Sequence, residues 1–175
     1  MRANRRSYLI VDGYNIINAW EDLQKIAQTD LDGAREKLTD IIIEYAHFTG
    51  RKSIIVFDAY NVKNSKENVE YRNSVTVVYT KEHQTADSYI EKFITTLSRY
   101  DDVKVATDDY AEQQIVLGKG ATRISSRELK IDLEMMKDKI KDKKSSDKRK
   151  TQRNRLEDRL DLETLSKLEN IRRKH

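Results

Sequence analysis

The chain has 175 residues, with no Cys and no Pro, and 37% of its residues are charged. Without Cys, a disulfide framework, a thiol nucleophile and a Cys-based zinc site are excluded. The longest apolar runs have four residues, as at 8–11 and 54–57, so no segment could span a membrane. The sequence therefore predicts a soluble, cytoplasmic protein with no membrane partner.

The charge is divided unevenly along the chain. Residues 137–175 hold 15 Lys and Arg against 8 Asp and Glu, a net charge of +7; the whole chain has +4, which leaves −3 for residues 1–136. An acidic body suits a metal site, and a basic tail suits a polyanion such as nucleic acid. The alternative is a solvated tail without a ligand. We expect one domain over residues 1–140 and a basic linker with a C-terminal helix over 141–175.

Short apolar runs of strand length recur along the chain, with helical patterns between most of them. The strand-like runs lie at residues 8–11, 53–57, 75–79 and 103–106, with a weaker fifth at 123–125. Apolar stripes predict helices at residues 31–48 (stopped by Gly50), 86–97 and 129–140. A shorter helix is expected at 109–117, and the polar residues 60–74 indicate a loop. This alternation predicts an open α/β sheet, mostly parallel, with helices on both faces.

Acidic side chains follow most of these strands. Asp12 ends the first strand, Asp58 follows the second, Asp87 starts the helix after the third, and Asp108 and Asp109 follow the fourth. In open α/β sheets the carboxyl ends of the strands form the edge where ligands bind. We therefore expect these carboxylates to converge at one edge of the sheet.

Two interpretations of this acidic set are open. An Asp after a strand, or in the first turn of a helix, often caps that helix or complements its dipole. Several carboxylates at one edge, however, repel one another unless a cation binds among them. Oxygen ligands without His or Cys favour Mg²⁺ or Mn²⁺. Such a metal can activate water for phosphodiester cleavage.

Other chemistries lack their motifs in this sequence. It contains no GxxxxGK[ST] loop and no GxGxxG fingerprint. The three histidines, His47, His83 and His175, have no spacing typical of a metal pair or a catalytic triad. A receiver-like fold with Asp58 as the phosphate acceptor stays open as an alternative.

Four sequence elements together resemble one nuclease family. They are Val11-Asp12-Gly13-Tyr14-Asn15, Phe57-Asp58-Ala59-Tyr60, Thr85-Ala86-Asp87 and Ala106-Thr107-Asp108-Asp109-Tyr110. Together with Gly118-Lys119-Gly120-Ala121 and Ser126-Arg127-Glu128-Leu129, they are similar in order and spacing to the YacP-like branch of the NYN domain family, within the PIN-like nuclease superfamily, over residues 7–143. The resemblance implies a Rossmann-like sandwich with a five-stranded, mostly parallel sheet between helices.

The resemblance also implies the residues of an active site. Asp12, Asp87 and Asp109 would hold one or two Mg²⁺ or Mn²⁺ ions, and Asp108 is the alternative to Asp109, because either could point inward. Two further residues would have accessory roles. Asp58 would act directly or through a water, and Asn15 would hold Asp12 or a phosphate oxygen by a hydrogen bond.

The function that the resemblance implies is a metal-dependent endoribonuclease that cleaves mRNA in the ribosomal A site and contributes to mRNA decay. Its partners would be mRNA and the ribosome, and its basic stretch would bind RNA through Lys143, Lys144, Lys148, Arg149, Lys150 and Arg153. Tyr14, Tyr60 and Tyr110 would stack on bases or pack locally. The alternative is a non-catalytic RNA- or ribosome-binding module with a nuclease-like fold. The sequence leaves the oligomeric state open, with a monomer as the default.

Overall fold

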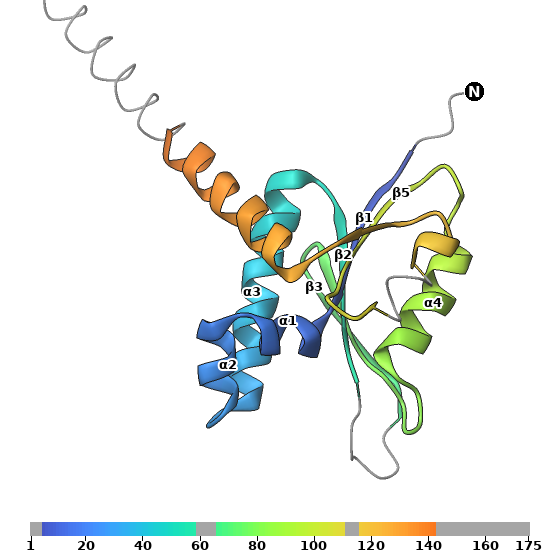
Figure 1. Cartoon of the computed structure of the whole chain (residues 1–175), viewed down its shortest axis with the longest axis horizontal. Coiled ribbons are helices and arrows are strands. Elements are labelled where there is room, and N and C mark those ends of the chain that lie inside the picture. The colour runs from blue at the N-terminus through green and yellow to red at the C-terminus, as the bar shows by residue number, and fades with distance from the viewer. Residues whose placement is uncertain (1–4, 59–65, 111–115, 143–175) are drawn as a thin grey trace, which may run out of the picture. The chain divides into compact units, whose positions relative to one another are not determined.

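The computed structural model describes residues 5–58, 66–110 and 116–142 of the chain, which are coloured in Figure 1. The strands are β1 (Ser7–Asp12), β2 (Lys52–Phe57), β3 (Asn68–Arg72), β4 (Val75–Tyr79), β5 (Asp102–Ala106) and β6 (Thr122–Ile124). The helices are α1 (Gly13–Ala19), α2 (Glu21–Ala27), α3 (Leu31–Thr49) and α4 (Ala86–Thr96), and residues 126–142 are also helical. Within these described stretches, no helix is long and apolar enough to cross a membrane.

The strands form one sheet in the order β3-β4-β2-β1-β5-β6. β3 runs antiparallel to β4, and the other neighbouring strands are parallel. β1 lies near the centre, where Ile10 is opposite Ile54 of β2 and Val105 of β5. Leu9, Ile10 and their neighbour Val11 are fully buried, because both faces of this parallel sheet are covered. The predicted α/β fold with a mostly parallel sheet is thus confirmed.

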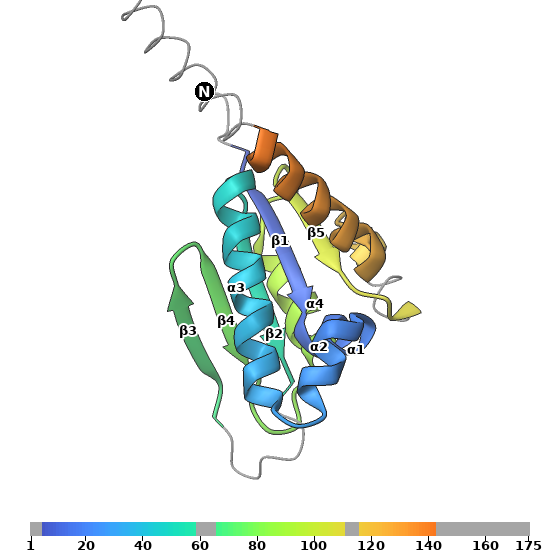
Figure 2. The same cartoon turned by 90° about the vertical axis from the view of Figure 1, so that its left-hand side faces the viewer.

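Helices cover both faces of the sheet. Figures 1 and 2 show α1, α2 and α3 on one face and α4 on the other. Ile90 and Ile94 of α4 pack in one apolar cluster with Ile10 and Val105 of the central strands. Full burial of an aliphatic side chain of this size contributes about 1.5–3 kcal/mol, so this contact holds α4 firmly against the sheet.

The helix predicted at residues 31–48 is confirmed as α3. It begins after Asp30, whose Oδ1 accepts the N–H of Gly33 at 2.8 Å. It buries Leu38 and Ile42 against the sheet side of the molecule, and it ends at Gly50, which has the left-handed backbone (φ 69°) that glycine adopts without strain. The stripe at residues 86–97 is likewise confirmed as α4.

The expected loop at residues 60–74 is wrong in part, since it contains β3 and gives the sheet six strands instead of five. Figure 2 shows β3 at the edge of the sheet beside β4. Val69 packs against the apolar cluster under α4, and Asn73, with φ 54°, makes the turn into β4. Most side chains of this edge strand are polar, so its sequence carries little strand signal.

Helices α1 and α2 also escape prediction, because each has only seven residues.

The chain divides into two compact units, Met1–Leu133 and Glu134–His175. The first contains the sheet and helices α1 to α4. Of the second, the structure describes residues 134–142, which are helical. The division at residue 140 stays a prediction, and most of the basic segment lies outside the described residues. The same holds for residues 111–115 of the helix predicted at 109–117.

Candidate active site

The carboxyl ends of the parallel strands carry the acidic residues at one edge of the sheet. β1 ends at Asp12, Asp58 follows β2, and Asp109 lies just beyond β5. Between β1 and β5 the strand order reverses, because the chain first adds β2 and β4 on one side of β1 and later adds β5 on the other. Ligands of open α/β sheets bind at such a switch point.

The strand order also decides the receiver-like alternative. We number the parallel strands first to fifth in chain order, as β1, β2, β4, β5 and β6. Across the sheet they then lie in the order third, second, first, fourth, fifth. Receiver-like folds have the order second, first, third, fourth, fifth. The receiver-like interpretation is therefore wrong.

Asp12 is a helix cap and a buried charge at the same time. Its Oδ1 accepts the N–H of Asn15 at 3.1 Å, which caps α1, and the residue is only 9% exposed. Burial raises the pKa of Asp12 to about 6, against the opposing effect of the Asn15 N–H. Three more carboxylates also raise it: Asp87, Asp109 and Asp58. We refer to Asp12, Asp58, Asp87 and Asp109 as the acidic cluster.

Asp87 reaches the acidic cluster from the first turn of α4. The N-cap of this helix is Thr85, whose hydroxyl oxygen accepts the N–H of Ser88 at 3.1 Å, so Asp87 is not needed as the cap. Burial raises the pKa of Asp87, and the charges of Asp109 and Asp58 raise it further. Asp12 therefore caps a helix and is also repelled by the other carboxylates, whereas Asp87 is repelled by them without capping α4.

Asp58 is tied to the end of the neighbouring strand. The hydroxyl of the buried Thr80 donates to Asp58 Oδ1 at 3.4 Å, and the Thr80 N–H donates to the carbonyl of Phe57 at 3.0 Å. Because Thr80 directly follows β4, it holds Asp58 between the ends of β2 and β4. The sequence gives no sign of this role, since a single Thr after a strand has no distinctive pattern.

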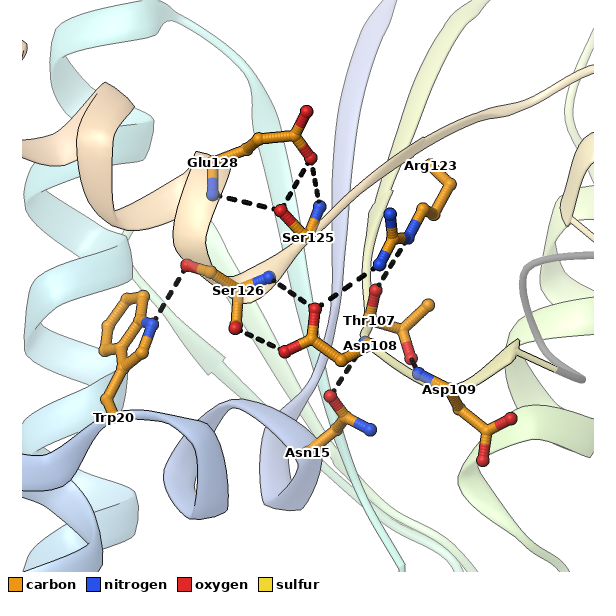
Figure 3. Close-up of polar contacts among 9 residues, drawn as sticks. All are labelled: Asn15, Trp20, Thr107, Asp108, Asp109, Arg123, Ser125, Ser126 and Glu128. Atoms are coloured by element: carbon orange, nitrogen blue, oxygen red, sulfur yellow. Dashed lines mark hydrogen bonds and ion pairs between the residues drawn. The ribbon is translucent and has the colours of Figure 1, made fainter.

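The two carboxylates that follow β5 point in different directions, as Figure 3 shows. Asp108 Oδ1 accepts the N–H of Ser126 at 2.9 Å, and Oδ2 accepts the Ser126 hydroxyl. The Arg123 guanidinium lies 3.4 Å from Asp108 Oδ1. Asp109, by contrast, raises the pKa of Asp12. Asp109 is therefore the member of this pair that belongs to the acidic cluster, and we leave Asp108 out of the proposed metal ligands.

Asn15 joins the segments that follow β1 and β5. Its backbone N–H donates to Asp12, and its side-chain Oδ1 accepts the N–H of Asp108 at 2.9 Å. The hydrogen bond expected from Asn15 to Asp12 is thus made by the backbone, while the side chain holds the neighbouring loop.

Gly13 lets β1 turn directly into α1 beside β2. A Cβ at this position would overlap the ring of Phe57, so any other residue would force the ring or the start of α1 to move. The ring of Tyr14 then packs on Phe57 with its centroid 5.3 Å away, and Arg35 Nε–H donates to the Tyr14 hydroxyl at 2.9 Å. Gly13 and Tyr14 thus contribute packing to this element, while Asp12 supplies its charge.

The three tyrosines expected near this edge differ in their surroundings. Tyr14 is half-buried between Phe57 and Arg35, which is the local packing that the sequence leaves open. Tyr110 is 73% exposed, so its ring is accessible to a base. Tyr60 lies outside the described residues, as do the six basic residues between 143 and 153 that are expected to bind RNA.

The chemistry of the acidic cluster fits a divalent metal ion. All its donors are carboxylate oxygens, the ligands that Mg²⁺ and Mn²⁺ prefer. Burial, and after it the repulsion among the carboxylates, raises the pKa of Asp12, and a bound cation would offset both effects. Within the described part of the chain, no three His, Asp or Glu side chains are grouped closely enough to hold a metal ion as they stand. The carboxylates would therefore have to rotate inward to share one.

Ser126 and Arg123 escape prediction as parts of this region. The one local signal is the pair Ser125 and Glu128, which has the spacing of a capping box. The structure forms this box: the Ser125 N–H donates to Glu128 Oε2 at 2.6 Å, and the Glu128 N–H donates to Ser125 Oγ at 3.1 Å. It marks the start of a helix, but nothing local shows that this start lies against Asp108.

Comparison with known proteins gives one family for most of the chain. The YacP-like NYN domain model matches residues 9–173, which reach further than the resemblance over residues 7–143. Bacillus subtilis (strain 168) YacP, described as uncharacterized, is 41% identical over 133 residues, which are 75% of this chain and 78% of that protein. The crystal structure of Rae1 (YacP) from Bacillus subtilis is 35% identical, with a TM-score of 0.70 over 95% of this chain and 94% of that one. A mutant of the same protein is 38% identical, with a TM-score of 0.66 over 77% and 78%.

Proposed function

Because the chain belongs to the YacP-like NYN domain family, we propose that it is a metal-dependent endoribonuclease that cleaves mRNA in the cytoplasm. The observation that carries this proposal is the acidic cluster at the switch point of the sheet. Its carboxylates come from four separate parts of the chain, and burial together with the charges of the other three raises the pKa of Asp12 to about 6. Charges of one sign gathered in this way are typical of a site that holds a cation.

In the proposed mechanism, Asp12, Asp87 and Asp109 bind Mg²⁺ or Mn²⁺. When bound, such an ion stabilises negative charge on a scissile phosphate and lowers the pKa of a water molecule. Asp12 holds its place through the Asn15 N–H, and Asp87 holds its place on the rigid first turn of α4. Asp58, fixed by Thr80, is an accessory carboxylate that orients the attacking water.

The basic segment gives the protein a second contact with RNA. Phosphates are repelled by the acidic body, so binding near the cluster needs basic side chains from elsewhere. The residues that we propose for this contact are Lys143, Lys144, Lys148, Arg149, Lys150 and Arg153. The family model includes this segment, which supports a role for it in the whole protein.

We propose further that cleavage depends on translation, at the A site of the ribosome, and contributes to mRNA decay. The basis is the sequence resemblance together with the separation of charge. A nuclease with an acidic body has little attraction for free RNA, and docking on ribosomal RNA through a basic segment would bring it to its substrate. A translating ribosome would then decide where the message is cut.

The experiment that tests this function measures cleavage of one end-labelled mRNA in Mg²⁺, either naked or being translated by purified ribosomes. The variants are Asp87→Asn and, as a matched control one turn further along α4, Glu91→Gln. Wild type and the control should cleave only the translated message, leaving 5′-phosphate and 3′-hydroxyl ends. Asp87→Asn should be slower by a factor of about 100 or more, because it removes a charge that the metal needs.

Other outcomes of this experiment point elsewhere. Equal cleavage of naked and translated mRNA would keep the endonuclease and remove the dependence on translation. Full activity of Asp87→Asn would contradict the site. No cleavage by wild-type protein that still co-sediments with ribosomes would favour the alternative, a non-catalytic binding module with a nuclease-like fold.

A further inference from the structure

The segment that carries Asp109 is fixed by bonds to β6. The N–H of the fully buried Thr107 donates to the carbonyl of Ile124 at 3.1 Å, and Arg123 Nε–H donates to the Thr107 carbonyl at 3.0 Å. The Thr107 hydroxyl oxygen then accepts the N–H of Asp109 at 3.0 Å. The backbone of Thr107 is therefore fixed at both its N–H and its carbonyl. The directions of the next two side chains then depend on what holds Asp108.

Asp108 is held from two sides at once (Figure 3). On one side its N–H donates to Asn15 Oδ1, and on the other its carboxylate accepts the N–H and the hydroxyl of Ser126. Arg123 adds a charged contact to the same carboxylate. These bonds link the segment after β1 to the start of the helical residues 126–142, and Asp108 lies in the middle of the link.

The Ser126 end of this link is itself anchored in the core. The Trp20 indole N–H donates to the Ser126 carbonyl at 3.0 Å, and Trp20 is only 6% exposed. The capping box of Ser125 and Glu128 fixes the first turn at the same point. Asp108 is exposed, but two hydrogen bonds from Ser126 and the contact with Arg123 favour one orientation of its carboxylate.

We infer that Asp108 is a positioning residue that sets the place of Asp109 in the acidic cluster and binds no metal itself. Asp108 and Asp109 follow the end of β5, and Figure 3 shows their carboxylates pointing to different sides of the segment. With the Asp108 carboxylate bonded to Ser126, the segment is held in the conformation that directs the Asp109 carboxylate away from Ser126. The catalytic consequence of this role rests on the proposed function, whereas the positioning itself does not.

The test compares Asp108→Ala, Asp108→Asn, Ser126→Ala and the double variant Asp108→Ala/Ser126→Ala in the full-length protein. Three properties are measured: the Mg²⁺ concentration for half-maximal cleavage of translated mRNA, the affinity for Mn²⁺ by calorimetry, and amide hydrogen exchange at positions 108 and 109 by NMR. Thermal unfolding confirms that each variant is folded at the assay temperature. Asp109→Asn serves as the comparison for the loss of a ligand.

Asp108→Ala should raise the half-maximal Mg²⁺ concentration by about 10- to 100-fold, the usual effect of losing an outer support of a metal ligand. High Mg²⁺ should restore most of the rate of Asp108→Ala, whereas it should not restore the rate of Asp109→Asn. Exchange at positions 108 and 109 should become at least tenfold faster. Asp108→Asn, whose amide oxygen still accepts the Ser126 N–H, should stay within about threefold of wild type. The double variant should resemble Asp108→Ala alone, because both changes remove the same link.

Three results would overturn the inference. The first is that Asp108→Ala shows the same amide exchange and Mn²⁺ affinity as wild type. The second is that the effects of Asp108→Ala and Ser126→Ala simply add in the double variant. The third is that Asp108→Ala loses cleavage activity as completely as Asp109→Asn and that high Mg²⁺ does not restore it. The last would make Asp108 a ligand. If wild type neither cleaves RNA nor binds Mn²⁺ while Asp108→Ala still exchanges faster, the proposed function fails and the positioning role stands.

Discussion

The hydrogen bond from the Asn15 N–H to Asp12 Oδ1, 3.1 Å long, ties the start of α1 to the most enclosed charge of the acidic cluster. This bond favours the ionised carboxylate, as helix caps do. Burial and the neighbouring carboxylates disfavour it and prevail, since the pKa of Asp12 is raised to about 6. At neutral pH the metal-free protein therefore carries an unfavourable charge at the point where α1 begins.

This charge predicts that metal-free protein loses stability as the pH rises from about 4 to 6. The pKa of Asp12 is about 6 in the folded state, against 3.8 for an unperturbed Asp side chain, so the folded state binds more protons between these limits. By linkage, the free energy of unfolding then falls with rising pH, by on the order of 2–3 kcal/mol from this residue. Urea denaturation in EDTA, followed by the fluorescence of the single Trp, measures it. Asp12→Asn should remove this part of the pH dependence; identical pH profiles for the two proteins would contradict the prediction.

Divalent metal should stabilise the wild-type protein at pH 7. An ion that binds only the folded state, at 100 times its dissociation constant, adds about 2.7 kcal/mol to the free energy of unfolding. Asp87→Asn should lose most of this gain, and Glu91→Gln, one turn further along α4, should keep it. Thermal unfolding with and without Mg²⁺ checks this. Equal gains in all three proteins would place the ion elsewhere.

Gly13→Ala should destabilise the protein and reduce its activity together. The added methyl group meets the Phe57 ring, so either the ring or the start of α1 has to move, at a cost of about 1–3 kcal/mol. A shift of α1 also moves Asp12, its N-cap. Gly118→Ala is the control, because a Cβ there has open space around it and the backbone angle is ordinary. Chemical denaturation should show little change for the control, and an equally small change for Gly13→Ala would show that the Phe57 ring yields freely.

Trp20→Phe should cost about 1–3 kcal/mol of stability, because it leaves the buried Ser126 carbonyl without the indole N–H that bonds to it. Circular dichroism in urea measures the loss, since the variant has no other Trp. Tyr100→Phe is a suitable control, with the hydroxyl of an exposed ring removed, and its effect should stay within about 0.5 kcal/mol. A neutral Trp20→Phe would mean that water replaces the indole donor.

Binding to RNA or to ribosomes should weaken steeply with salt. Each phosphate neutralised by a basic side chain releases counterions, so the logarithm of the affinity falls linearly with the logarithm of the salt concentration. Replacing Lys143, Lys144 and Lys148 by Gln should flatten the slope by about two to three, at about 0.7–0.9 per contact. Filter binding or co-sedimentation at several salt concentrations gives the slope. The same slope for wild type and this variant would remove the segment from the interface.

The sequence predicts those features that have local or periodic causes. The apolar run before Asp12 predicts a buried central strand, and the stripe that ends at Gly50 predicts α3, because each pattern is complete within a few turns of chain. The convergence of Asp12, Asp58 and Asp87 follows from the rule that parallel strands end at one edge. β3 escapes prediction, because it is an edge strand and only one of its faces is partly buried. The sequence of such a strand resembles that of a polar loop.

What the sequence cannot decide is the choice between Asp108 and Asp109. The two are adjacent and chemically identical, and what distinguishes them is their partners. Asn15 lies 93 residues before Asp108, and Ser126 lies 18 residues after it. Contacts over such distances arise from the packing of the whole sheet. The same reason hides Thr80 from prediction, which lies 22 residues from Asp58.

The position of β1 in the sheet has a consequence for the order in which the protein is made. β1 is synthesised first, yet it lies between β2 and β5, so its second edge stays unpaired until residues 102–106 have been made. Asp109 follows these residues, and the Ser126 anchor comes later still. Pairing between distant segments is slow and completes late in folding. A growing chain therefore cannot assemble the acidic cluster until its sheet is almost fully synthesised, and the nuclease that we propose is inactive while it is itself being translated.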